Sequence, residues 1–330
     1  MKTITTIALL FPLISFCQYN LNGHYLDYDK KPGTDQLKKF TYENLRLYPI
    51  IAKDSFKLAF KNLTKFTPLK KALEQKKAVI TEKGTGAEVN TLTIENKSKD
   101  TIIINSGEVI KGGQQDRVIN TDMVLYPNSG KKDLPVFCVE HGRWSVRNQS
   151  TSSGVRGTNN QPGNGSFNSY SFSSMELRKV VAKENQQQKV WQKVEDINKS
   201  NSSENSTGTY TELEKSSGYK TKIDKYVPFF TNALKNEKDI VGVVVVTGDK
   251  ILGADIFATN ELFMQNLDGL LHSYATDAII NGKPVNISQD AVDKYINDLL
   301  SNDKKQEETI KKKGSKFENN GKKLRISSFQ

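Results

Sequence analysis

The side chains best suited to do chemistry are concentrated in residues 107–144, which read GEVIKGGQQDR, then VINTDMVLYPNSGKK, then DLPVFCVEHGRW. The neighbouring glycines Gly112 and Gly113 allow a ligand or another backbone segment to approach closely. The amide pair that ends at Gln115 offers hydrogen-bond donors and acceptors. Two residues later, the planar guanidinium of Arg117 suits a carboxylate or a phosphate. This half of the segment therefore predicts contacts to a small anionic ligand.

The second half of the segment adds an acid, an arginine and an aromatic ring. Strand alternation places Cys138 and Glu140 on one face of a strand. Arg143 and Trp144 follow directly, and a guanidinium and an indole could flank a flat ring. Glu140 is the candidate catalytic residue, because a carboxyl beside arginine side chains can act as a general acid or base.

Each feature also has a structural interpretation, so three functions stay open. Paired glycines are more often a turn or a bulge than a phosphate cradle. Glu140 could form an ion pair with Arg117 or Arg143 that only holds two strands together. Cys138 is more typical of a core residue than of a nucleophile. The segment is thus a binding site for a small anionic ligand, a packing device in a structural envelope protein, or the site of a hydrolase that uses Glu140.

Several other function classes lack their signatures. The glycine spacing is neither that of a Walker loop nor that of a Rossmann fold, and no Gly-x-Ser-x-Gly elbow is present. Three dispersed histidines make a zinc site improbable, so we expect no metal, and the sequence specifies no cofactor. The net charge of +11 comes from lysines spread along the chain without clustered arginines and aromatics. This pattern predicts no nucleic-acid partner.

The first 17 residues have the pattern of a secretory signal peptide. Lys2 provides a positive start, an apolar run of about ten residues follows from Ile7 to Phe16, and small residues precede the cut before Gln18. Acylation of Cys17 in a lipoprotein is the alternative, and Phe16 disfavours it because a small residue is preferred at that position. No later run has the roughly 20 apolar residues of a transmembrane helix. We therefore expect an exported bacterial protein, periplasmic or secreted.

Hydrophobic patterning predicts one α+β domain over residues 40–301. Short strands separated by turns over 40–140 favour a β-sandwich or β-roll-like N-terminal half. Helices are expected over 174–199, 222–236, 260–281 and 288–300 in a helical C-terminal half. The apolar run IVGVVVVT, followed by KILGADIF, predicts a hairpin that joins the sheet.

The remaining segments are expected to be loosely ordered. They are an N-terminal segment at 18–39, a mobile Ser/Gly/Asn-rich loop at 148–174, a second polar loop at 201–217, and a Lys-rich tail at 302–330 with a short strand near its end. In the helix over 174–199, Trp191 is expected to be the largest member of the buried stripe.

The central segment resembles the signature of the ADP-ribosylglycohydrolase (ARG) and rhodanese-phosphatase-superfamily-associated protein domain, a bacterial family. The matching positions are Gly107, Glu108, Gly112, Gly113, Gln115, Arg117, Pro135, Val136, Cys138, Val139, Glu140, Arg143 and Trp144. Asp116 departs from the asparagine of many members. Val190-Trp191 and GADIF (Gly253 to Phe257) also fit, and the likeness covers most of residues 40–281. The resemblance implies a link to ADP-ribose and phosphate chemistry but no defined reaction.

Overall fold

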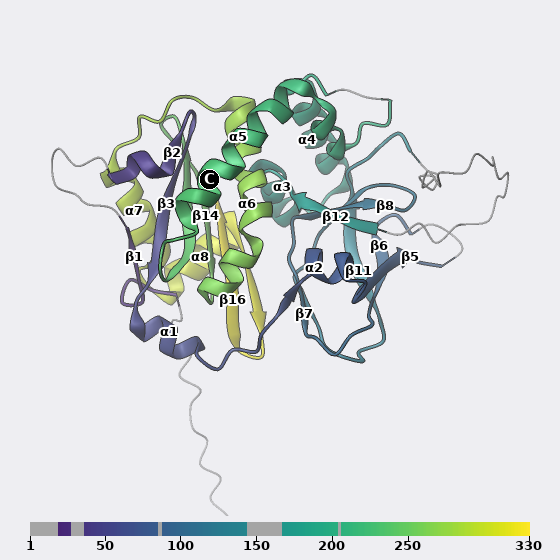
Figure 1. Ribbon diagram of the computed structural model, residues 1–330, viewed down its shortest axis with the longest axis horizontal. Helices are drawn as coiled ribbons and strands as arrows, with labels where there is room; N and C mark the ends of the chain where they lie inside the picture. The colour runs from purple at the N-terminus through teal and green to yellow at the C-terminus, as the bar shows by residue number, and fades with distance from the viewer. Residues whose placement is uncertain (1–18, 28–35, 85–87, 144–166, 204–205) are drawn as a thin grey trace, which may run out of the picture.

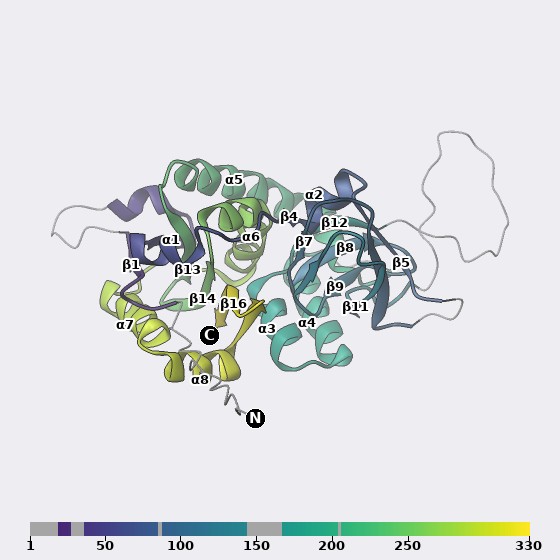
Figure 2. The ribbon, with the colours of Figure 1, turned by 90° about the horizontal axis from the view of Figure 1, so that it is seen from below.

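Two groups of strands organise the molecule, and helices pack around them (Figure 1). The structure is a computed structural model that describes residues 19–27, 36–84, 88–143, 167–203 and 206–330. The expected signal peptide, Trp144 and most of the Ser/Gly/Asn-rich loop lie outside the described residues. Seen from below, the two groups of strands lie side by side, with helix α3 (Met175–Lys183) near the boundary between them (Figure 2).

The larger group is one sheet built from both ends of the chain. Its strand order is β1-β3-β13-β14-β16-β15, with β2 paired to β3. The strands are β1 (His24–Leu26), β2 (Thr41–Tyr42), β3 (Leu45–Ala52), β13 (Ile240–Thr247), β14 (Lys250–Phe257), β15 (Gly314–Asn319) and β16 (Lys322–Phe329). Every residue of β13 is buried, because this run of β-branched side chains lies in the middle of the sheet and is covered on both faces.

The smaller group consists of a six-stranded sheet in the order β12-β8-β9-β11-β6-β5 and a three-stranded sheet in the order β10-β7-β4. The strands are β4 (Thr67–Pro68), β5 (Ala78–Glu82), β6 (Thr91–Asn96), β7 (Ile102–Ile104), β8 (Glu108–Gly112), β9 (Arg117–Ile119), β10 (Met123–Leu125), β11 (Lys131–Cys138) and β12 (Phe167–Phe172). Buried and partly exposed residues alternate along β6, as expected for a strand with one face on a core. Together these sheets form a half-barrel with its own hydrophobic core.

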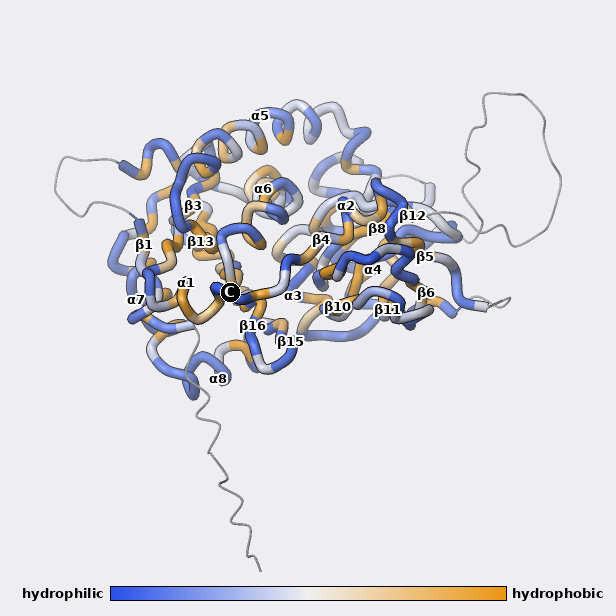
Figure 3. The backbone as a smooth tube through the Cα atoms, turned by 60° about the horizontal axis from the view of Figure 1, so that its bottom comes forward, coloured by the Kyte–Doolittle hydropathy of each residue, from blue (hydrophilic) through white to orange (hydrophobic). Residues whose placement is uncertain are grey.

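Helices cover both faces of the large sheet and close the end of the half-barrel. In addition to α3 they are α1 (Asp54–Phe60), α2 (Leu69–Glu74), α4 (Gln187–Ser200), α5 (Ser217–Leu234), α6 (Asn260–Asn281), α7 (Gln289–Leu300) and α8 (Asp303–Lys313), with 3-10 turns η1 (Gln36–Phe40) and η2 (Tyr210–Lys215). The hydroxyl of Thr259 accepts a hydrogen bond from the Leu262 amide (3.1 Å) and so caps the start of α6. Along the backbone, apolar residues are concentrated in the central strands and polar residues on the outer helices (Figure 3).

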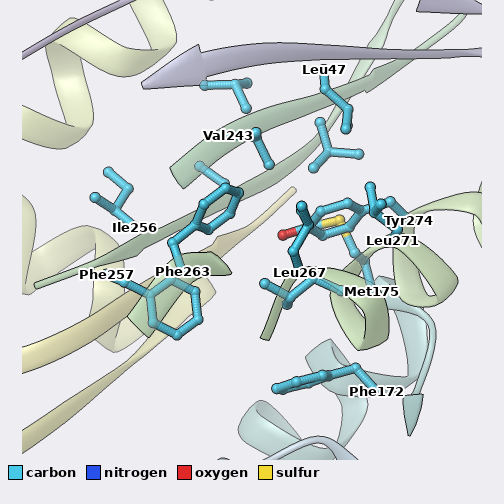
Figure 4. Close-up of a cluster of buried hydrophobic side chains, with 14 of the residues drawn as sticks. Leu47, Phe172, Met175, Val243, Ile256, Phe257, Phe263, Leu267, Leu271 and Tyr274 are labelled. Atoms are coloured by element: carbon cyan, nitrogen blue, oxygen red, sulfur yellow. The ribbon is translucent and has the colours of Figure 1, made fainter. Parts of the chain in front are cut away.

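Helix α6 supplies much of the main core. Its side chains Phe263, Leu267, Leu271 and Tyr274 lie against the strands of the large sheet (Figure 4). The core continues through α3 and β12, because Met175 and Phe172 belong to the same cluster. This main core therefore crosses the boundary between the two groups of strands, while the half-barrel also keeps its separate, smaller core.

The α+β class is confirmed, with a β-rich N-terminal part and a helical C-terminal half. The expected hairpin is β13–β14, and it joins the sheet by pairing with β3 on one side and β16 on the other. None of the helices in the described residues is long and apolar enough to cross a membrane.

The Lys-rich segment at 302–330 is not a tail, and that prediction was wrong. It contains α8 and two strands, and β16 lies between β14 and β15 with six consecutive buried residues at its C-terminal end. The lysines mislead because they lie on the outer face of α8, whereas Gln306 and Ile310 face inward. The tertiary pairing of β16 with β14 decides the structure of this segment.

The other segments predicted to be loose are also partly structured. In the 18–39 segment, Tyr19 and Leu37 are buried, and β1 pairs with β3. Residues 167–172 of the predicted mobile loop form β12, which pairs with β8. In the second polar loop, η2 packs with Tyr210 and Leu213 buried. Composition misled at these places because a few apolar residues anchor each polar stretch.

Candidate functional site

The motif segment folds as a hairpin beside a third strand. Strands β8 and β9 pair through Val109 and Val118, and β9 pairs with β11 so that Arg117 lies opposite Cys138. The turn between β8 and β9 contains Gly113 at φ +52°. A Cβ added there would lie 2.2 Å from the Phe167 ring and 2.4 Å from Glu82 Oε1, so neighbouring side chains already occupy the space above this glycine. The paired glycines thus form a tight turn.

Glu140 and Arg143 form a buried, bidentate ion pair. Arg143 Nε donates to Glu140 Oε1 (2.9 Å) and Nη2 donates to Oε2 (2.6 Å). Arg143 Nη1 donates to the Gly113 carbonyl (2.8 Å), which ties the β8–β9 turn to the end of β11. Burial alone would raise the pKa of the Glu140 carboxyl, but the hydrogen bonds from Arg143 and from the Asp116 amide hold that pKa below its usual value.

Asp116 extends this cluster toward η2. Its Oδ2 accepts hydrogen bonds from the hydroxyls of Thr209 (2.8 Å) and Thr211 (2.6 Å), and its Oδ1 accepts one from the Gly112 amide (3.0 Å). Asp116 Oδ1 is also 3.5 Å from Arg143 Nη2. We refer to Asp116, Glu140, Arg143, Thr209 and Thr211 as the acid–arginine cluster. The Asp116 carboxylate is thus stabilised by hydrogen bonds from two threonine hydroxyls and one amide, and it shares the charge of Arg143 with Glu140.

Gln115 and Cys138 lie next to this cluster and are also buried. Gln115 Nε2 donates to the Glu140 carbonyl (2.7 Å), and the Cys138 thiol contacts Gln115 Oε1 (2.9 Å). The side-chain amide of Gln187 makes two hydrogen bonds of 2.8 Å to the backbone of Cys138: Oε1 accepts from the Cys138 amide, and Nε2 donates to the Cys138 carbonyl. Burial raises the pKa of the Cys138 thiol to about 11, although Arg117 acts in the opposite direction. The thiol is therefore protonated near neutral pH and is a weak nucleophile.

Arg117 differs from its neighbours because its charge has no partner. The side chain is completely buried, and Nη1 reaches only the Asp116 carbonyl at 3.5 Å. Within the described chain, Nε and Nη2 have no hydrogen-bond partner. Two further acceptor atoms, Glu82 Oε2 on β5 and Gln114 Oε1 in the β8–β9 turn, are also buried without a partner in the described chain. Such groups are rare in folded proteins, because each costs the desolvation of a polar atom.

A second buried ion pair lies where the two groups of strands meet. Arg178 on α3 donates from Nη1 (2.8 Å) and Nη2 (2.5 Å) to the two oxygens of Asp255 on β14. Its guanidinium lies 5.4 Å from the ring centres of Phe172 and Phe329, which belong to different sheets. Burial opposes ionisation of Asp255, but Arg178 lowers the pKa of its carboxyl to about 2. We call this group the junction cluster.

The first glycine of the motif is explained by the junction cluster. Gly107 has φ +89°, and a Cβ there would lie 2.9 Å from Cγ of Arg178. The next residue, Glu108, accepts hydrogen bonds from the amide nitrogen of Asn105 (3.0 Å) and from its side chain (2.7 Å). Burial raises the pKa of Glu108 to about 7. The start of the motif therefore packs against the boundary between the sheets and away from the acid–arginine cluster.

The structure brings together most of the residues expected from the sequence. Gly113, Gln115, Glu140 and Arg143 are joined by hydrogen bonds, and Gly112 contributes its amide to Asp116. Arg117 is adjacent but unpaired, and the position of Trp144 lies outside the described residues. In the part of the chain that is described, no group of three or more His, Cys, Asp or Glu could hold a metal ion.

Other participants could not be found from the sequence motif. Thr209, Thr211 and Gln187 come from distant polar stretches, and only the fold places them here. For Arg178 and Asp255 the sequence gives only a weak indication of a role. Asp255 is the single acid inside GADIF, and Arg178 is the only arginine in an amphipathic helix.

Fold and site together define an α+β domain with a conformationally fixed motif around buried arginines. The chain belongs to the family of the ARG and Rhodanese-Phosphatase-superfamily-associated Protein domain, whose model matches residues 34–328. This match includes the C-terminal strands β15 and β16, in agreement with their place in the large sheet. No curated protein and no solved structure matches the chain.

Proposed function

We propose that this domain binds a small anionic ligand at the motif, with Arg117 as the residue that contacts the anion. The observation that carries the proposal is the buried Arg117 guanidinium, whose Nε and Nη2 have no partner in the described chain. A carboxylate or phosphate oxygen would satisfy both donors and balance the charge. The resemblance of the motif to a family linked with ADP-ribose chemistry, and the expected export signal, make an exported binding protein the coherent interpretation.

The unpaired acceptors narrow the ligand class. Glu82 Oε1 accepts the Gln114 amide (2.7 Å), whereas Glu82 Oε2 and Gln114 Oε1 are buried without donors. The Cys138 thiol is within electrostatic range of both Arg117 and Glu82, so these groups belong to one region. A ligand that carries an anion and hydroxyl groups, such as a sugar phosphate, would supply an acceptor to Arg117 and donors to the two acceptors.

Glu140 supports binding better than catalysis. Both of its oxygens accept hydrogen bonds from Arg143, and Oε2 also accepts the Asp116 amide (3.0 Å). Because its pKa is held below the usual value, the carboxyl carries no proton to donate near neutral pH. We therefore place Glu140, Gln115 and Arg143 as positioning residues that fix the hairpin on which Arg117 lies.

A packing device is the second candidate function, and one observation favours it. Asp116, Glu140 and Arg143 are buried in mutual pairs, an arrangement that can hold strands together without any ligand. The two candidates differ at Arg117: a packing device gains nothing from an unpaired guanidinium, whereas a binding site requires one.

Thermal unfolding of residues 19–330 with inorganic phosphate, ribose 5-phosphate and ADP-ribose would separate the two candidates. Binding to the native state raises the melting temperature, and the rise grows with the logarithm of ligand concentration above the Kd. We expect at least one of these probes to stabilise the wild-type protein and to lose its effect in Arg117→Met. Lys111→Met is the matched control, because it removes a partly exposed positive charge from the same hairpin. Stabilisation that survives in Arg117→Met, or none in the wild type, would favour the packing device.

A further inference from the structure

The large aromatic side chain of α4 is turned away from the core. The buried stripe of this helix consists of Val190, Val194 and Ile197. Trp191, expected from the sequence to be its largest member, is only half-buried and lies outside the core clusters, so that prediction was wrong. It shares a face of the helix with Gln188, Gln192 and Glu195, at spacings of three and four residues. Trp191 therefore lies at the surface, outside the two core clusters.

This face of α4 forms one wall of an open cavity. The cavity measures about 560 Å³, within the range of roughly 300–1,000 Å³ usual for small-molecule sites. The end of the motif segment also lines it, and there the His141 ring packs edge-on against Trp191, with 4.5 Å between ring centres. Gly142 donates its amide to the Thr207 carbonyl (2.7 Å), which fixes this end of the segment to the neighbouring loop. The cavity is therefore lined by α4, by the end of the motif segment and by residues 206–208.

The lining has the chemistry of a site for a neutral, hydroxyl-rich ligand. It carries Trp191, the amides of Gln188 and Gln192, the Ser206 hydroxyl and one carboxylate, Glu195. Asn198 and Thr207 also line it, but the Asn198 amide is bonded to Thr209 and Ser203, and the Thr207 side chain is bonded to Glu140. No lysine or arginine lines it, so a phosphate would find no counter-charge among these residues. The side chains of Gln188 and Gln192 are exposed and make no hydrogen bond within the described chain.

We propose that this Trp191 cavity binds a neutral saccharide. The apolar C–H face of a hexose ring would stack on the indole, while the planar amides and the Glu195 carboxylate would hydrogen-bond its hydroxyl groups. Glu195 is suited to accept from hydroxyls, because its ion pair with Lys199 lowers the pKa of the carboxyl and keeps it charged. The site is distinct from Arg117 in charge and composition, and the two proposals can fail independently.

Tryptophan emission offers a direct test, because the chain has two tryptophans. In a Trp144→Phe protein the emission comes from Trp191 alone. We expect glucose, galactose, N-acetylglucosamine or one of their β-1,4-linked dimers to shift this emission in a saturable manner. Glucose 6-phosphate should bind more weakly than glucose, because the described lining contains no lysine or arginine for its phosphate and does contain the Glu195 carboxylate. The opposite order, or the absence of a shift with every sugar, would overturn the proposal.

Two substitutions separate recognition from folding. Trp191→Ala, followed by calorimetric titration with the sugar that binds, should weaken binding about tenfold or more, the usual effect of losing an aromatic anchor. Gln192→Ala should weaken binding less and leave the melting temperature unchanged, because this side chain is exposed. Lys189→Ala, on the same helix but outside the lining, serves as the control. Equal affinity of wild type, Trp191→Ala and Gln192→Ala would show that the sugar binds elsewhere.

Discussion

Two buried arginines of this domain face opposite situations. Arg178 in the junction cluster has a bidentate carboxylate partner in Asp255 and lies over the rings of Phe172 and Phe329. Arg117 in the motif is equally buried but has no carboxylate partner, and two of its nitrogen atoms donate to nothing in the described chain. Both side chains lost their hydrogen bonds to water when the chain folded. Only Arg178 gained a carboxylate partner in their place.

This difference indicates different roles. A buried charge with a matched counter-ion is structural, because removing either partner leaves an uncompensated ion. A buried charge without a counter-ion lowers stability and persists where it serves another purpose, such as ligand binding. The acid–arginine cluster around Arg143 resembles the junction cluster in this respect, although it belongs to the same motif as Arg117. Substitutions at these positions should therefore change stability by different amounts and with different signs.

The largest effect is expected from Asp255→Ala. This change leaves Arg178 buried without its counter-ion and takes an acceptor from Tyr274, whose hydroxyl donates to Asp255 (2.8 Å). We expect the free energy of unfolding, measured with urea, to fall by about 3–5 kcal/mol. Asp268→Ala is the control, since it breaks an exposed ion pair with Lys70 and should cost at most about 1 kcal/mol. Similar losses in both variants would contradict a structural role for the junction cluster.

Arg143→Met should come next in size. It leaves Glu140, whose side chain is fully buried, without its bidentate partner, and it frees the Gly113 carbonyl. A decrease of roughly 2–4 kcal/mol in the free energy of unfolding is expected, because breaking a buried ion pair exposes the desolvation cost of the remaining charge. For Arg143→Lys we expect an intermediate decrease in the free energy of unfolding, because an ammonium cannot form the bidentate contact with Glu140.

Glu108→Gln should remove a pH dependence. The folded-state pKa of Glu108 is about 7, above its ordinary value of 4.5, so the folded protein holds this proton more tightly than the unfolded chain. The contribution is fully present below the unfolded pKa and is lost as the pH rises through about 7. Urea unfolding at about pH 5 and about pH 8 should therefore show a larger decrease for wild type than for the variant. Parallel profiles would place the Glu108 pKa near its ordinary value.

Arg117→Met should have the smallest effect on stability. Unlike Asp255→Ala and Arg143→Met, it should not lower the free energy of unfolding. The variant exchanges an unpaired, buried guanidinium for an apolar side chain of similar length, which is expected to leave the free energy of unfolding unchanged or to raise it. Chemical unfolding without added anions would measure this directly. A loss comparable to that of Arg143→Met would mean that Arg117 is part of the structural network.

The local patterns in the sequence predicted a large share of the fold. The central strand β13 follows from a run rich in β-branched residues, and α6 (Asn260–Asn281) and α7 (Gln289–Leu300) match the helices predicted over 260–281 and 288–300 to within one residue. The motif also pointed to residues that the fold brings together, since Gly113, Gln115, Glu140 and Arg143 are joined by hydrogen bonds. These patterns are local, so they can be recognised without knowing which segments pack together in the fold.

Lysine content misled at the C-terminus, and polar composition misled at η2, because in both places a few buried residues determine the structure. The direction of Trp191 also could not be read from helical spacing, since it depends on which face of α4 meets the motif segment.

The sequence by itself determined the fold class, the family and the residues of the motif, since these depend on residue types and short spacings. The tertiary structure decided which of the charged residues are paired. Glu140 could have paired with Arg117 or Arg143, and only the bend after β11 brings Arg143 back over it. Pairing depends on distances between atoms that are remote along the chain, and burial converts each matched or unmatched charge into a large free-energy difference.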